Sequence, residues 1–156
     1  MSDTADARFA ISDLVLTYAE RIDLGDFDGV AELFTHAEVT AEGMEGAQQG
    51  RDAVLAMFSN STRRYPNGTP LTKHVTTNLI VEVDLAAGTA TGRSYFTVFQ
   101  AVPGSLPLQP VIGGRYRDRF ELAGGAWRFA ARHMIVDLVG DLSQHLLYDY
   151  PPPASL

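Results

Sequence analysis

The sequence predicts an α+β fold in which helices come first and a long antiparallel meander of strands follows. Apolar residues recur with a helical period up to about residue 58, and the period changes to two from residue 71 onward. Segregated helices and strands typically pack as helices on one face of an antiparallel sheet. Four expected strands of roughly 11 to 14 residues exceed the usual strand length, and long strands bend. We expect three N-terminal helices on a strongly curved, mostly antiparallel sheet, forming a cone-shaped α+β barrel with an interior pocket.

Three amphipathic segments predict the helices. The first carries an apolar stripe at helical spacing and ends near Gly25, a residue type suited to a helix C-terminus. The second covers residues 27–34, and Asp26 is its expected N-cap. The third begins near Arg51, after a short strand at residues 36–42. The stripe of the first helix consists of Ile11, Leu14, Val15, Tyr18, Ala19 and Ile22.

Four segments with period-two alternation predict the meander, and Gly- and Pro-bearing turns separate them. They cover residues 71–84, 89–102, 111–122 and 126–138. We expect a proline-bearing connection at residues 103–110. An irregular, apolar and aromatic tail follows the last strand. The chain is therefore expected to form a single domain over residues 1–156, with a core at about 8–138 and the tail at 140–156.

Composition narrows the class of protein. The chain has 156 residues, of which 46% are apolar, and a net charge of −7. This acidic balance disfavours binding to nucleic acid, which needs clustered Lys and Arg. The absence of cysteine excludes disulfides and thiolate chemistry. The polar N-terminus has no signal-peptide pattern and no run of 18 apolar residues occurs, so we expect a cytoplasmic protein that does not enter a membrane.

Strand alternation separates the two faces of the segment at residues 111–122. Tyr116 and Asp118 share a face with Ile112 and Phe120, and we expect this face to point inward. The opposite face carries Arg115, Arg117, Arg119 and Glu121, and it is expected to be a solvated surface or a dimer surface.

Strand alternation also places two candidate residues of the first strand on one face, and it leaves the inward residue of the last strand undecided. His74 and Asn78 fall on one face of the segment at residues 71–84. Arg132 and His133 point to opposite faces of the last strand, and the pattern does not show which one is inward.

Asp23 stands at the margin of the apolar stripe and in the last turn of the first helix. A carboxylate there opposes the helix dipole at a cost of about 0.3–1 kcal/mol. A histidine partner would compensate this placement, and His74 is the candidate. The alternatives are that Asp23 is a solvated residue before the Gly25 turn, and that His74 is an ordinary strand histidine. Tyr18, in turn, fits simple core packing as well as chemistry.

Known catalytic and cofactor motifs give no signal. The sequence contains no HExxH, no paired histidines at metal-ligand spacing, no GxGxxG or Walker loop and no GxSxG elbow. We therefore expect neither a metal nor a cofactor.

Five segments together resemble the SnoaL-like family of the nuclear-transport-factor-2-like superfamily, whose members have a cystatin-like, cone-shaped α+β fold. The resemblance spans about residues 8 to 138. The segments are YAERIDLGDFDGVAELF (18–34), GRDAV (50–54), KHVTTN (73–78), GRYRDRFE (114–121) and AWRFAAR (126–132).

This resemblance implies a set of site residues. Lyases of the family pair an Asp at the end of the first helix with a His on the first long strand, which correspond here to Asp23 and His74. Tyr18 corresponds to a tyrosine that acts as acid or orienter. Some dehydratases carry a second pocket histidine where Gln100 stands here, and a tyrosine where Ile22 stands. The expected substrate contacts are Tyr116, Asn78, Phe58, Met57 and Arg132.

The resemblance implies a cofactor-independent lyase or isomerase of dehydratase type. Such an enzyme acts on a small apolar cyclic or polycyclic molecule through a His–Asp dyad in an enclosed pocket. The alternative from another class is a non-catalytic binding or assembly module, similar to the β subunits of ring-hydroxylating dioxygenases. A homodimer or higher homo-oligomer is expected in either case.

Overall fold

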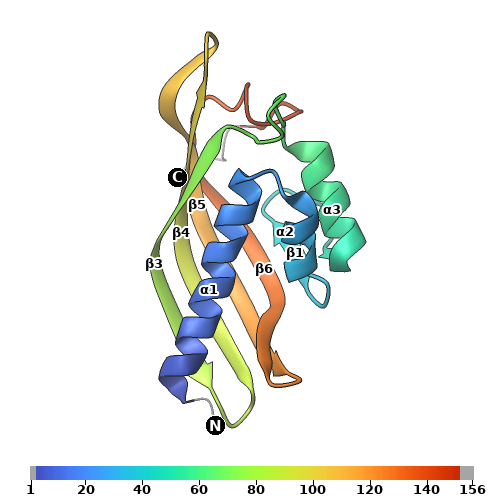
Figure 1. The fold of residues 1–156 in the computed structure, drawn as a ribbon, viewed down its shortest axis with the longest axis vertical. Coiled ribbons are helices and arrows are strands. Elements are labelled where there is room, and N and C mark those ends of the chain that lie inside the picture. Colours follow the sequence, from blue (N-terminus) through green and yellow to red (C-terminus); the bar gives the residue numbers. More distant parts are fainter. Residues whose placement is uncertain (1–2, 152–156) are drawn as a thin grey trace.

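A computed structural model describes residues 3–151 and contains three helices (Figure 1). The first helix begins earlier than its apolar stripe, because the Asp3 side chain caps it by accepting a hydrogen bond from the Asp6 N–H. Asp26 caps the second helix through the Gly29 N–H at 2.9 Å, which confirms the expected N-cap. The helices are α1 (Thr4–Asp23), α2 (Phe27–Leu33) and α3 (Gly50–Ser61).

Six strands form one sheet. They are β1 (Glu38–Ala41), β2 (Gln48–Gln49), β3 (Thr72–Asp84), β4 (Thr89–Val102), β5 (Leu106–Ala123) and β6 (Ala126–Val139). Their order is β2-β1-β6-β5-β4-β3, and every neighbouring pair is antiparallel except β1 with β6. β2 and β3 are the two edges and do not pair with each other, so the sheet of the expected cone-shaped α+β barrel is open.

The predicted connection at residues 103–110 is wrong for most of its length. β5 already begins at Leu106, whose partner is Val102, and Pro110 pairs with Phe99. Before Ile112, β5 has no β6 partner on its other side, since β6 ends at Val139, which pairs with Ile112. Proline is tolerated at such an edge because no ladder hydrogen bond is lost there. Figure 1 shows the resulting β4–β5 hairpin projecting beyond the rest of the sheet.

A bulge in β3 reverses the expected faces of this strand. The pairing with β4 shifts between Thr77 and Ile80, and Asn78 has a left-handed backbone with φ of 54°. The extra residue exchanges the two faces of the strand. The His74 side chain is therefore buried before the bulge, whereas Ile80, which strict alternation would put on the same face, is 46% exposed after it.

The core lies between α1 and the face of the long strands that α1 covers, and Figure 1 shows α1 running along these strands. Inward residues on β5 include Tyr116, Asp118 and Phe120, each at most 3% exposed, which confirms their predicted face. Register shifts between β4 and β5 and between β5 and β6 add further local bends. No helix within residues 3–151 is both long enough and apolar enough to cross a membrane.

The part of the tail at residues 140–151 is irregular and docks on the end of α3. Leu146 forms an isolated bridge with Thr62, and the Leu147 N–H donates to the Ser61 carbonyl at 2.9 Å. The Tyr65 hydroxyl donates to the Gln144 carbonyl at 2.6 Å. These bonds fix the tail over the space between the helices and the sheet. The remainder of the expected tail, residues 152–156, lies outside the described residues.

Candidate active site

A cavity of about 410 Å³ lies between the helices, the sheet and the tail. Ligand pockets typically have volumes of about 300–1,000 Å³. Most of its wall is apolar, from Met57 and Phe58 of α3 and from strand residues such as Phe96 and Val98. Polar groups form the smaller part of the lining, and they include His74, Tyr116 and Glu42.

His74 on β3 lines this cavity, and Asp23 at the end of α1 holds it from behind. His74 Nδ1 lies 2.6 Å from Asp23 Oδ1, and the His74 backbone N–H donates to Asp23 Oδ2 at 2.7 Å. The Thr72 hydroxyl donates to Oδ1 at 2.8 Å. An ionised carboxylate can only accept, so Nδ1 carries a proton, and in the neutral ring Nε2 is the nitrogen with the free lone pair. Both side chains are less than 10% exposed.

The carboxylate of Asp23 keeps its charge in this setting. Burial alone would raise its pKa, but the hydrogen bonds and charge of His74, with the Thr72 hydroxyl, outweigh burial and lower the pKa below its ordinary value. The predicted cost of an Asp in the last helical turn is therefore offset by three donors. A charged acceptor behind His74 is the arrangement that stabilises an imidazolium.

Two tyrosines, Tyr18 and Tyr116, stand beside His74 in the cavity wall. Their ring centroids are 5.8 Å apart with the rings edge to face, and the Tyr18 and His74 centroids are 6.4 Å apart. Burial raises the pKa of Tyr18 even though the charge of Arg132 lowers it, and it raises the pKa of Tyr116 further. Both phenols therefore keep their protons at neutral pH and can donate a hydrogen bond.

The sequence analysis expected Arg132 to contact the substrate, but Arg132 does not line the cavity. Its fully buried guanidinium forms a two-bonded ion pair with Asp118, with both N–O distances at 2.8 Å. It lies 3.9 Å from the Tyr116 ring centroid and 4.3 Å from that of Tyr18. The tyrosine rings thus separate Arg132 from the cavity, and its influence on a ligand is indirect. The question left open on the last strand is answered, since Arg132 is the inward residue.

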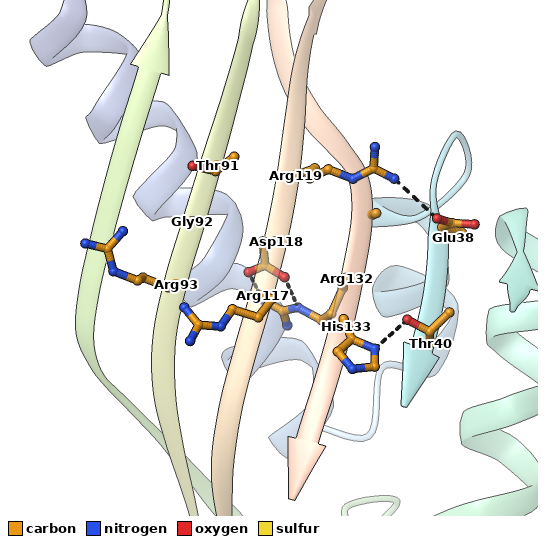
Figure 2. Close-up of a pocket in the computed structure, with 11 residues that line it drawn as sticks. Glu38, Thr40, Thr91, Gly92, Arg93, Arg117, Asp118, Arg119, Arg132 and His133 are labelled. Carbon is orange, nitrogen blue, oxygen red and sulfur yellow. Dashed lines mark hydrogen bonds and ion pairs between the residues drawn. The ribbon is translucent and has the colours of Figure 1, made fainter. Parts of the chain in front are cut away.

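The opposite face of the sheet has its own shallow hollow, shown in Figure 2. Arg119 pairs there with Glu38 at 3.3 Å, and the Thr40 hydroxyl lies 2.7 Å from His133 Nδ1. Arg93 and Arg117 also border it, so this hollow is charged where the inner cavity is apolar.

The predicted site residues divide into three groups. Five of them line the inner cavity: Tyr18, Met57, Phe58, His74 and Tyr116. Asp23 and Arg132 stand behind this wall. Asn78 is not brought to the cavity at all, because the bulge leaves it exposed beside Arg93 and Arg115 on the outer face. The structure therefore separates Asn78 from the other predicted substrate contacts.

Sequence reasoning missed the contribution of the tail. His145, Leu146, Tyr148 and Tyr150 complete the cavity wall. Their available signal was the aromatic and apolar character of an irregular segment, because such a segment needs a surface to cover. Within residues 3–151, no cluster of three or more His, Cys, Asp or Glu residues is arranged to hold a metal ion.

The fold belongs to a recognised class of α+β proteins. An NTF2-like protein with a cystatin-like fold from Novosphingobium aromaticivorans matches with a TM-score of 0.67 and 23% identity, over 87% of this chain and 91% of that chain. The sequence profile of the SnoaL-like domain matches residues 3–133. The chain belongs to the SnoaL-like domain family.

Two further solved structures carry enzyme names. A putative scytalone dehydratase from Novosphingobium aromaticivorans has a TM-score of 0.69 and 22% identity, covering 90% of this chain and 91% of its own. The hexachlorocyclohexane dehydrochlorinase LinA-type3 from Novosphingobium barchaimii has a TM-score of 0.68 and 22% identity, covering 96% and 97%. At these identities the likeness establishes the fold alone. A comparison with curated protein sequences gives no match.

Proposed function

We propose that this protein is a cofactor-independent lyase or isomerase of dehydratase type that acts on a small apolar cyclic molecule. One observation carries the proposal: a histidine with a buried carboxylate behind its Nδ1 lines an apolar cavity large enough for such a ligand. The names of two similar structures, the putative scytalone dehydratase and the dehydrochlorinase, both denote eliminations, which supports this class of reaction.

His74 serves as the general base in this proposal. Its Nε2 takes a proton from a ring carbon, and the C–H electron pair forms a double bond to the neighbouring carbon as the leaving group departs with its own bonding pair. For a hydroxyl leaving group, the proton on His74 then passes to the departing hydroxide, so water leaves and the base is restored. Asp23 stabilises the intermediate imidazolium, and base catalysis of this kind contributes about 10²–10⁴-fold.

The two tyrosines serve the oxygen of the substrate. Tyr18 and Tyr116 retain their protons, so each can donate a hydrogen bond to an oxygen on which negative charge develops. Arg132 behind the rings is positively charged, since the ion pair with Asp118 outweighs burial and raises its pKa. Its positive charge, 3.9 Å from the Tyr116 centroid, lowers the pKa of both phenols against the effect of burial, which makes them stronger hydrogen-bond donors.

The alternative is a non-catalytic binding or assembly module, and it would be favoured if side chains filled the interior of the fold. The open cavity beside His74 favours the enzyme instead. A structural histidine also has no need of a carboxylate bound by three donors at the edge of a ligand-sized space.

The test is a screen of cyclic alcohols, β-hydroxy ketones and chlorinated cyclohexanes, with alkene product followed by mass spectrometry. We expect turnover by the wild-type protein, a loss of at least about 100-fold in His74→Ala, and little change in His133→Ala. His133 is a matched control because it is a strand histidine bonded to Thr40 on the outer face. Equal turnover in His74→Ala and wild type would reject the proposed base.

A further inference from the structure

His145 is a second histidine in the cavity, and it has no role in the reaction described above. The tail carries it there, and the ring lines the same cavity as His74. Its backbone is fixed, since the Arg63 N–H donates to the His145 carbonyl at 2.8 Å and the His145 N–H donates to the Leu142 carbonyl at 3.0 Å. Its position is therefore set by the bonds between the tail and α3.

The imidazole of His145 is buried without a hydrogen-bond partner. The residue is only 7% exposed, and its Nδ1 is inaccessible and unpaired among the described residues. Buried polar side chains are almost always hydrogen-bonded, so an orphan on the wall of a ligand-sized cavity needs an explanation. Because Nδ1 itself is inaccessible, a ligand in the cavity would pair with the other ring nitrogen, Nε2, which no hydrogen bond within residues 3–151 occupies.

The surroundings keep this ring neutral. Burial, and to a smaller extent the charge that His74 carries when protonated, outweigh the opposing charge of Asp23 and lower the pKa of His145 to about 4. Within residues 3–151, no carboxylate is hydrogen-bonded to the His145 ring, in contrast to Asp23 on His74. A neutral imidazole offers one N–H donor and one acceptor nitrogen, and it does not compete with His74 for a proton.

We propose that His145 is a binding residue that hydrogen-bonds an oxygen substituent of the cyclic ligand, and that the cavity therefore selects ketones and alcohols over hydrocarbon rings of equal shape. This deepens the proposed function, on which its relevance to turnover rests, by naming the chemical class of the substrate. The apolar wall at Met57, Phe58 and Phe96 holds the ring, and His145 recognises its oxygen.

The experiment compares matched probes in the full chain. Dissociation constants for 2-naphthol and naphthalene are measured by displacement of N-phenyl-1-naphthylamine fluorescence, and folding of each variant is checked by thermal melting. The wild type is expected to prefer 2-naphthol by about five- to tenfold more than His145→Phe does, because one hydrogen bond to a neutral group contributes a factor of this order. His145→Gln should restore part of the preference, and His36→Phe should leave it unchanged.

A ratio of the two dissociation constants that is the same in wild type and His145→Phe overturns the inference. His145→Met is the second apolar variant if the Phe side chain prevents folding, and the same ratio decides it. The readout does not depend on turnover. A protein without activity that keeps the difference between wild type and variant rejects the proposed function but supports this inference, whereas an active enzyme without the difference rejects this inference alone.

Discussion

Asp23 binds both the ring and the backbone of His74, with its Oδ1 2.6 Å from Nδ1 and its Oδ2 accepting the backbone N–H at 2.7 Å. The backbone N–H is always a donor, so it fixes one carboxylate oxygen independently of the ring. This double attachment joins the end of α1 to the beginning of the edge strand β3, and it orients the imidazole toward the cavity.

The double attachment predicts the effect of Asp23→Asn. The His74 backbone N–H will retain the amide oxygen, which leaves the amide NH₂ against Nδ1 and forces the proton onto Nε2. The base then has the wrong tautomer, so the loss of kcat should approach that of His74→Ala. Steady-state kinetics on a substrate found by the screen measures this loss. Thr72→Val, which removes only the third donor, should cost much less activity; a loss equal to that of Asp23→Asn would contradict the tautomer argument.

The pKa of Asp23 makes part of the stability depend on pH. Its folded pKa lies below the unfolded value, so its contribution to the free energy of unfolding is present above about pH 4 and is lost as the pH falls through the folded pKa. Urea unfolding of wild type and Asp23→Asn should therefore differ at pH 7 and converge in acid. A difference that is the same at pH 7 and pH 3 would show that the stabilisation does not depend on the carboxylate charge.

His145 titrates in a higher window. Its folded pKa of about 4 lies below its unfolded value of 6.5, so the unfolded chain takes up a proton first as the pH falls. The free energy of unfolding is therefore unaffected by His145 above pH 6.5 and decreases as the pH falls from 6.5 toward 4. A shift of this size corresponds to about 3 kcal/mol. The wild type should lose stability over this window, and His145→Phe should lose about that much less. Parallel pH profiles for the two proteins would place the neutral, buried histidine in doubt.

Breaking the Asp118–Arg132 pair should destabilise the core strongly. Asp118→Ala leaves an uncompensated buried guanidinium and should cost about 3–5 kcal/mol, measured by chemical denaturation. Asp137→Ala is the control, since its ion pair with Arg115 is about one-third exposed and such pairs contribute about 0–1 kcal/mol. Equal costs for the two variants would mean that burial does not strengthen the inner pair.

The expected homo-oligomer remains a prediction. Val75, Ile80 and Tyr95 are each more than 40% exposed on the outer face of β3 and β4, and such a patch favours association. Sedimentation velocity should show a species of at least twice 16.9 kDa at micromolar concentration, and Tyr95→Glu should shift it toward monomer. A wild-type monomer at these concentrations would contradict the prediction.

Local sequence patterns predicted the helices, the strands and the inward face of β5, because periodicity depends on near neighbours. They failed at Asn78, where one residue with a left-handed backbone reverses the faces of β3. They also could not place His145, because the site of an irregular tail depends on bonds to α3 that are distant in sequence. The contact of Asp23 with His74 followed from the family resemblance, and spacing alone had left it open.

The most direct test of the central claim is carbon–hydrogen exchange catalysed by His74. A cyclic ketone such as 2-tetralone is incubated with the protein in D₂O, and loss of the signal from the protons beside the carbonyl is followed by NMR. The account predicts exchange faster than the buffer background in wild type and in His133→Ala, and exchange at the background rate in His74→Ala. Exchange that is equally fast in His74→Ala, in a protein that retains probe binding, would contradict the assignment of His74 as the base.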